Sequence, residues 1–175
     1  EDLLFQIQHH CYGTLLASAR EAIDREDEPR EKLLVFIHHH LGYFRHNMNE
    51  MKVLAHEDLT LAGEYGERIL ALKREYSRLL VDIVAELDAE LPHRQRRPSP
   101  EIAAFLLFGA MNWLYTWPRR LRQLPAEQLA DAVARTFLEG YSGAFLASGR
   151  RDRSEAPAFW NESLVLGKAA RKESL

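Results

Sequence analysis

Histidine is the residue type in this chain that could most readily bind a metal, and it is concentrated in one segment. Five of the eight histidines lie between residues 38 and 56. His39 and His46, with Glu50 one helical turn further on, combine the imidazole and carboxylate ligands that zinc and iron sites use. Seven residues span about 10 Å of helix, however, too far for both imidazoles to reach one ion unless the helix bends. A helical-bundle metalloprotein or enzyme that uses these three residues is therefore the alternative hypothesis.

Other patterns that would indicate catalysis are incomplete. The His–Glu pair that begins at His56 is followed by Thr60, where a zinc protease would have its second histidine. Glu90 and His93 have the spacing of a di-iron ligand pair, but this pattern occurs once and contains a proline. Residues 140–144, GYSGA, lack the glycine spacing of a nucleophile elbow. We predict that the chain is not an enzyme and needs no cofactor.

Length, composition and charge narrow the class of protein. The 175 residues are 46% hydrophobic and 28% charged, which is typical of a globular domain. A chain of this length buries roughly 70% of its unfolded surface, so folding requires neither a disulfide nor a metal. The net charge of −3 provides no general positive field for nucleic acid or an anionic membrane.

The cellular compartment can be inferred from three features of the sequence. Cys11 is the only cysteine, so no internal disulfide can form, as suits a reducing compartment. The chain does not start with the charged and apolar regions of a signal peptide. It also has no run of about 18 uncharged apolar residues that could span a membrane. We therefore expect a cytoplasmic protein.

Helices must position the histidines and the other candidate residues named above. Apolar side chains recur at intervals of three and four, and no alternating pattern typical of strands is sustained. We predict an all-α fold of six to seven helices with short connections. One face of the long helix expected at residues 67–90, which carries Lys73, Arg74, Arg78, Asp82 and Glu86, is expected to be solvated. The expected helices cover residues 2–24, about twenty residues from Pro29, 67–90, 101–117, 125–147 and, more weakly, 157–170.

The predicted helix 101–117 is apolar on every side, so every side must be covered. It could lie at the centre of one subunit, or it could pack inward on one side and against a second copy on the other. The next helix favours the second arrangement, because Gly140 would let a partner helix approach closely. Pro118 ends the apolar helix, and the arginines that follow it return the chain to water where the interface would end. The predicted dimer-interface residues are Trp113, Trp117, Val133, Phe137, Gly140 and Tyr141.

The segment of residues 105–143, FLLFGAMNWLYTWPRRLRQLPAEQLADAVARTFLEGYSG, resembles the last two helices of the tetracycline-repressor (TetR) family of transcriptional regulators. The similar features are Asn112–Trp113, a second tryptophan at 117 and Leu138–Gly140. Residues 1–10 resemble the helix that follows the DNA-binding module of this family, and residues 71–84 resemble its long pocket helix.

The resemblance implies a TetR-type C-terminal helical bundle. Residues 1–148 would bind an effector and form a homodimer, and residues 149–175 would be a C-terminal extension with a short helix. The family's helix-turn-helix, through which it binds duplex DNA, is expected to be missing from this chain. A repressor that responds to a hydrophobic effector is implied, with an acyl-CoA or aryl-CoA thioester as the first expectation.

The resemblance also places the effector between the second helix, the long helix and the helix 101–117. A stripe of large apolar side chains is more often plain core, and it is the resemblance that favours a pocket in these segments. Asn112 could be the polar anchor of the ligand, or it could form a hydrogen bond between helices. The predicted ligand-binding residues are His40, Phe44, Met48, Tyr76, Leu80, Phe105, Phe108, Met111 and Asn112.

Overall fold

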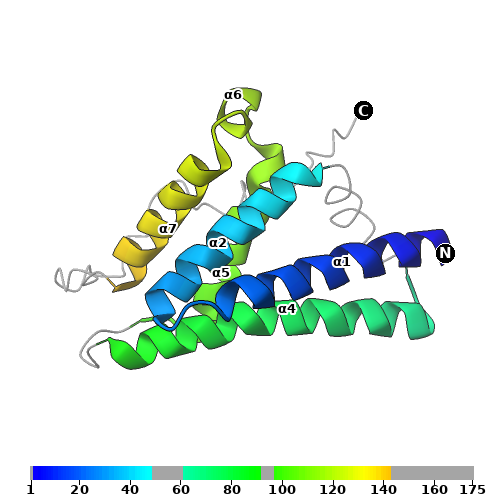
Figure 1. Cartoon of the computed structure of the whole chain (residues 1–175), viewed down its shortest axis with the longest axis horizontal. Helices are drawn as coiled ribbons and strands as arrows, with labels where there is room; N and C mark the ends of the chain where they lie inside the picture. The colour runs from blue at the N-terminus through cyan, green and yellow to red at the C-terminus, as the bar shows by residue number, and fades with distance from the viewer. Residues whose placement is uncertain (1, 49–60, 92–96, 143–175) are drawn as a thin grey trace, which may run out of the picture. The chain divides into compact units, whose positions relative to one another are not determined.

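The computed structural model describes residues 2–48, 61–91 and 97–142, and every regular element in these ranges is a helix (Figure 1). The all-α prediction is confirmed. Five of the helices exceed one turn, slightly fewer than the six to seven expected, and the predicted helix 157–170 lies outside the described residues. The elements are α1 (Asp2–Ile23), α2 (Pro29–His46), α4 (Gly63–Glu90), α5 (Pro100–Asn112), a 3-10 turn η1 (Trp113–Thr116), α6 (Arg119–Arg122) and α7 (Ala126–Ser142).

Helix α2 lies at the centre of the domain and has contacts with α1, α4, α5 and α7. Its Pro29 occupies the first turn, where a missing amide proton costs nothing. Leu33, Phe36 and Ile37 have no exposed surface and form the middle of the core. In Figure 1, α1 runs alongside α4 and α7 runs alongside α2, so the helices form crossed pairs.

Helix α4 starts four residues earlier than its apolar pattern predicts, at Gly63 rather than at residue 67. The sequence reading assigned the two glycines here to a turn that precedes the helix. Gly63 has a φ of 60°, a conformation that favours glycine, and so makes the turn at the first helical residue. At Gly66, a Cβ atom would lie 2.6 Å from the carbonyl oxygen of Leu61. The chain can therefore turn tightly into the helix only because both residues lack side chains.

Helix α5 ends earlier than predicted, because residues 101–117 do not form one helix. The start is as expected: the Ser99 hydroxyl accepts a hydrogen bond from the amide of Ile102, and Pro100 is in the first turn. After Asn112 the chain tightens into the 3-10 turn η1. A residue before proline avoids the helical region, and Trp117 is extended in front of Pro118. The apolar segment is consequently split between a helix and a turn.

The apolar character of α5 is only partly explained by the core. Ala103, Leu107 and Met111 are buried on one face. Ile102, Phe105, Leu106 and Trp113 keep between 57% and 65% of their surface exposed, which is unusual for large apolar side chains. Helix α5 is therefore not the centre of the subunit, and it presents an uncovered apolar face.

Helix α7 packs on α2 through Leu129, Ala130, Ala134 and Leu138, all of which are buried. In the described part of the chain, no helix is both long enough and apolar enough to cross a membrane.

Candidate functional site

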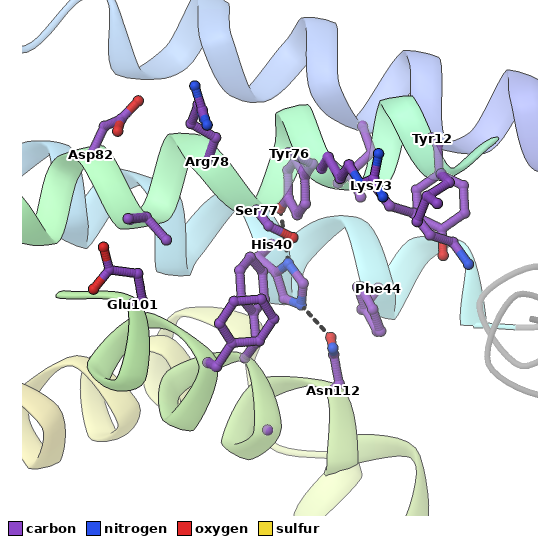
Figure 2. Close-up of a pocket in the computed structure, with 17 residues that line it drawn as sticks. Tyr12, His40, Phe44, Lys73, Tyr76, Ser77, Arg78, Asp82, Glu101 and Asn112 are labelled. Carbon is purple, nitrogen blue, oxygen red and sulfur yellow. Dashed lines mark hydrogen bonds between the residues drawn. The ribbon is translucent and has the colours of Figure 1, made fainter. Parts of the chain in front are cut away.

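A cavity of about 970 Å³ opens between four helices (Figure 2). This volume lies within the range of small-molecule sites, roughly 300–1,000 Å³. Helix α2 contributes two aromatic rings to its wall, α4 lines its length, and α5 borders it on the far side. The lining residues are Tyr12, Leu15, His40, Phe44, Leu70, Lys73, Arg74, Tyr76, Ser77, Arg78, Val81, Asp82, Glu101, Phe105, Phe108, Gly109 and Asn112.

His40 on α2 connects the other two long walls of the cavity. Its Nδ1 lies 2.8 Å from the phenol oxygen of Tyr76 on α4, and its Nε2 lies 3.0 Å from Oδ1 of Asn112 on α5. Figure 2 shows the three side chains in one line, with Asn112 at its end. Burial away from water lowers the pKa of His40 to about 3, so the imidazole is neutral at physiological pH. Burial likewise raises the pKa of Tyr76 well above its usual value.

Aromatic rings enclose this polar group. The Phe44 ring stacks on His40 with centroids 4.3 Å apart, and the Phe108 ring meets the imidazole edge-on at 5.7 Å. Phe36 lies behind them, with its centroid 5.3 Å from that of Tyr76. Such walls favour an apolar ligand, because they remove apolar surface from water and offer few competing hydrogen bonds.

The outer lining of the cavity is charged. Lys73, Arg74 and Arg78 on α4 are accompanied by the carboxylates Asp82 and Glu101. Lys73 and Tyr12 lie at one end of the cavity in Figure 2, and Arg78 lies at the other end with both carboxylates. The Lys73 ammonium is 5.2 Å from the centre of the Tyr12 ring, and partial burial lowers its pKa. The first end is therefore the more cationic one.

Six of the nine predicted ligand-binding residues line the cavity: His40, Phe44, Tyr76, Phe105, Phe108 and Asn112. Leu80 and Met111 are fully buried in the core, and Met48 is half-buried beyond the end of α2; none of these three is part of the lining.

Sequence reasoning missed the polar side of the cavity. It assigned Lys73, Arg74, Arg78 and Asp82 to a solvated face, and these residues are in the lining. Tyr12 and Ser77 were not singled out at all. The charged residues of the long helix could have indicated this side of the cavity. The same sequence pattern, however, occurs on a helix face that meets bulk solvent.

The predicted dimer-interface residues fall into two groups. Trp113 is exposed, and Gly140 is exposed with nothing within 4 Å of the place where a Cβ would lie. Trp117, Val133 and Phe137 are partly buried against the core of their own subunit. The side chain of Tyr141 lies outside the described part of the structure.

The residues of the metal hypothesis have other partners. His39 Nε2 lies 2.9 Å from the Ser18 hydroxyl, and His46 Nδ1 lies 2.7 Å from the carbonyl oxygen of Gly42. Glu50 lies outside the described residues. Within residues 2–48, 61–91 and 97–142, no group of three or more histidine, cysteine or carboxylate side chains is placed to hold an ion.

An all-helical domain whose cavity has an aromatic wall and a charged mouth is suited to binding a small molecule. A family model described as the tetracyclin repressor-like, C-terminal domain matches residues 26–141, and the chain belongs to this family. The prediction of a TetR-type transcriptional regulator is thereby confirmed. No curated protein matches the sequence.

Several solved structures share the fold. AibR, crystallised in complex with isovaleryl coenzyme A and operator DNA, is 25% identical with a TM-score of 0.67, over 77% of this chain and 72% of that one. A TetR-family regulator from Bordetella parapertussis has a TM-score of 0.70 at 22% identity, with 79% and 71% covered. The TetR-family regulator PfmR from Thermus thermophilus has a TM-score of 0.67 at 22% identity, with 78% and 73% covered.

Proposed function

We propose that this domain is the effector-binding and dimerisation part of a cytoplasmic TetR-type repressor. Its effector is a hydrophobic molecule with an anionic group, and an acyl-CoA or aryl-CoA thioester is the class that fits best. The observation that carries the proposal is the cavity, which combines an aromatic wall with a cationic end at Lys73 and has Arg74 in its lining. The first feature would hold an acyl or aryl group, and the second would hold phosphate.

The similar structure of AibR supports this effector class, because that protein binds isovaleryl coenzyme A. The cavity volume of about 970 Å³ is ample for a branched or aromatic acyl group. The mouth is open and charged, so the nucleotide end of such a ligand would remain partly in water. Neither feature requires a chemical step, in agreement with a binding protein that is not an enzyme.

We further propose a homodimer formed through α5 and α7. Ile102, Leu106 and Trp113 expose a continuous apolar stripe on α5 and its following turn, and a second copy would remove this surface from water. On α7 the small residues Ala132, Thr136 and Gly140 recur every four residues on the exposed side. Two such faces related by a twofold axis would form a four-helix interface.

The coupling from effector to DNA would pass along α4. This helix lines the cavity from Leu70 to Asp82, and its beginning is attached to the start of α1. There the Phe5 ring stacks on Tyr65 at 4.2 Å, and the Arg68 guanidinium lies 4.8 Å from the centre of the Phe5 ring. A ligand that moves α4 would move α1 with it, and with α1 a DNA-reading helix-turn-helix on its N-terminal side. The shift requires that the effector bind the two states with different affinities.

Gly109 offers a direct test of the cavity. It lines the cavity, and a Cβ at this position would meet no atom of the described residues within 4 Å. Gly109→Leu should therefore fold normally and fill the ligand space. In the wild-type protein, a panel of CoA thioesters should include one that stabilises the domain by about 2.7 kcal/mol at a hundred times its dissociation constant, visible as a rise in melting temperature.

The same thioester should leave the melting temperature of Gly109→Leu unchanged. Gly13→Leu is the matched control, because Gly13 is also helical with open space around its Cα but is not part of the cavity lining. If no thioester, fatty acid or aromatic acid shifted the wild-type melting temperature, the proposed effector class would be wrong.

A further inference from the structure

Tyr76, His40 and Asn112 form a hydrogen-bonded row that begins in the core and ends in the cavity (Figure 2). The residues at its inner end, Tyr76 and His40, are 5% and 2% exposed. Asn112, at its outer end, is exposed and belongs to the cavity lining. All three residues line the cavity, and Asn112 offers a ligand the most exposed surface of the row.

The direction of the hydrogen bonds follows from the number of protons in the row. A neutral imidazole has one N–H donor and one lone-pair acceptor, on different nitrogens. Within the described residues, the phenol oxygen of Tyr76 makes its hydrogen bond with His40 Nδ1. If the phenol accepted this bond, its own proton would be left buried without a partner, which costs about 1–3 kcal/mol. The Tyr76 hydroxyl therefore donates to Nδ1.

This direction determines what Asn112 presents to the ligand. With Nδ1 as the acceptor, the imidazole proton is on Nε2, which donates to Oδ1 of Asn112. An amide whose oxygen is used in this way has its two N–H donors on the other side. In the described part of the chain, the Asn112 side chain makes its hydrogen bonds through Oδ1 alone, so the N–H groups remain for a ligand.

We propose that Asn112 is the specificity-determining residue of the cavity, and that its amide N–H groups select ligands with an acceptor oxygen, namely a carbonyl, at the apolar end. The inference rests on the proposed function, and it adds the polar group that the effector must place beside Phe44 and Phe108. The nearby Ser77 hydroxyl can donate or accept, so it imposes no such choice. The opposite arrangement, with a proton on Nδ1 and a reversed amide, would select a ligand that donates.

A matched pair of probes tests the selection. Isovaleryl-CoA and the isopentyl thioether of CoA have the same charge and carbon chain, and only the first has a carbonyl oxygen. The wild-type protein should bind the thioester more tightly by roughly three- to tenfold, the difference that one hydrogen bond supplies. Titration calorimetry gives both dissociation constants.

Two variants remove the selection in different ways. Asn112→Asp keeps an acceptor for the imidazole but replaces the N–H donors with a carboxylate, so the preference for the thioester should disappear or reverse. The effect of the added charge on the CoA phosphates is common to both probes and cancels in the ratio, whereas its repulsion of the carbonyl oxygen acts on the thioester alone. Tyr76→Phe removes the phenol that sets the direction, so the same ratio should fall towards one. A residue with a merely structural role would weaken both probes and leave their ratio unchanged.

The imidazole itself provides a test that needs no ligand. Long-range proton–nitrogen NMR correlations distinguish the two neutral forms of His40, and the proton should be on Nε2. A proton on Nδ1, or a thioether that binds wild type as tightly as the thioester, overturns the inference and leaves the proposed function intact. If neither probe binds while another thioester of the panel does, the same comparison is made with that acyl group; if no thioester of the panel binds, the effector class is wrong, and the NMR result still decides the direction of the row.

Discussion

Nε2 of His40 lies 3.0 Å from Oδ1 of Asn112, although the two residues are 72 positions apart in the chain. This contact joins the central helix α2 to the end of α5, where the helix gives way to the 3-10 turn. The imidazole in this contact is buried and must remain neutral, so the cavity has an uncharged polar group beside its aromatic rings. Ligand recognition and acid stability therefore depend on the same side chain.

The buried imidazole should make the domain sensitive to acid. Burial lowers the pKa of His40 from its usual 6.5 to about 3, so between these values the unfolded chain binds a proton that the folded chain does not. Stability is therefore complete above about pH 6.5 and falls as the pH decreases, by at most about 1.4 kcal/mol per pH unit for one group.

The measurement is urea unfolding of the wild-type protein and His40→Gln between pH 4.5 and 7. The variant should be less stable at pH 7 but should lose less stability on acidification. His39, whose pKa burial also lowers, is present in both proteins, so the difference isolates His40. The exposed His10→Gln serves as the control and should follow the wild type. Parallel curves for wild type and His40→Gln would contradict the neutral imidazole.

Substitution of Gly140 should separate folding from association. A Cβ at this position would meet no atom of the described residues within 4 Å, so the Gly140→Leu subunit should fold as well as the wild-type subunit or slightly better. At a twofold interface the same leucine would be overpacked twice, at roughly 1–3 kcal/mol each.

Sedimentation at micromolar concentration should show a dimer for the wild type and for Gly13→Leu, and a weakened dimer for Gly140→Leu. A wild-type monomer would rule out the proposed homodimer. A Gly140→Leu dimer as stable as the wild type would place the interface elsewhere than on α7.

The charges at the cavity mouth should contribute unequally to the binding of a CoA thioester. Lys73 lies at the more cationic end, and Arg74 follows it in the chain and is also in the lining, whereas Arg78 shares its end with Asp82 and Glu101. Arg74→Gln should raise the dissociation constant by up to about fivefold, since exposed charge pairs contribute roughly 0.2–1 kcal/mol. Arg78→Gln should have a smaller effect, because the two carboxylates offset its charge.

Calorimetry at two salt concentrations measures this difference. The effect of Arg74→Gln should shrink at high salt, because screening weakens exposed charge interactions. Arg30→Gln, at an exposed position outside the cavity lining, is the control. Equal effects of all three substitutions would mean that the mouth does not distinguish its two ends.

Removal of metal should have no effect on the domain. His39 and His46 are engaged with Ser18 and Gly42, and they do not converge on a common point. Purified protein should contain no stoichiometric zinc, iron or manganese by elemental analysis, and a chelator should leave its melting temperature unchanged. Stoichiometric metal, together with a lower melting temperature after chelation, would instead favour the metalloprotein hypothesis.

The sequence by itself determined the helical class of the fold and most of the helix boundaries, because these depend on local properties. Apolar spacing follows the helical repeat, and Ser99 with Pro100 starts α5 as predicted. The prediction was less accurate at Gly63 and Trp113, where one backbone torsion or a proline several residues later changes the local geometry. The family resemblance was also readable, since it depends on the order of residues.

Only the tertiary structure decided which side of each helix meets the cavity. Six of the predicted ligand residues line it, but Leu80 and Met111 are in the core, because apolar residues look alike in a pocket and in an interior. Lys73 and Arg74 line the cavity although the sequence places them on a solvated face, since charged side chains suit both a cavity mouth and an outer helix surface. The contacts of His40 with Tyr76 and Asn112 span 36 and 72 residues. Such contacts depend on how helices cross, and that is set by the packing of the whole core.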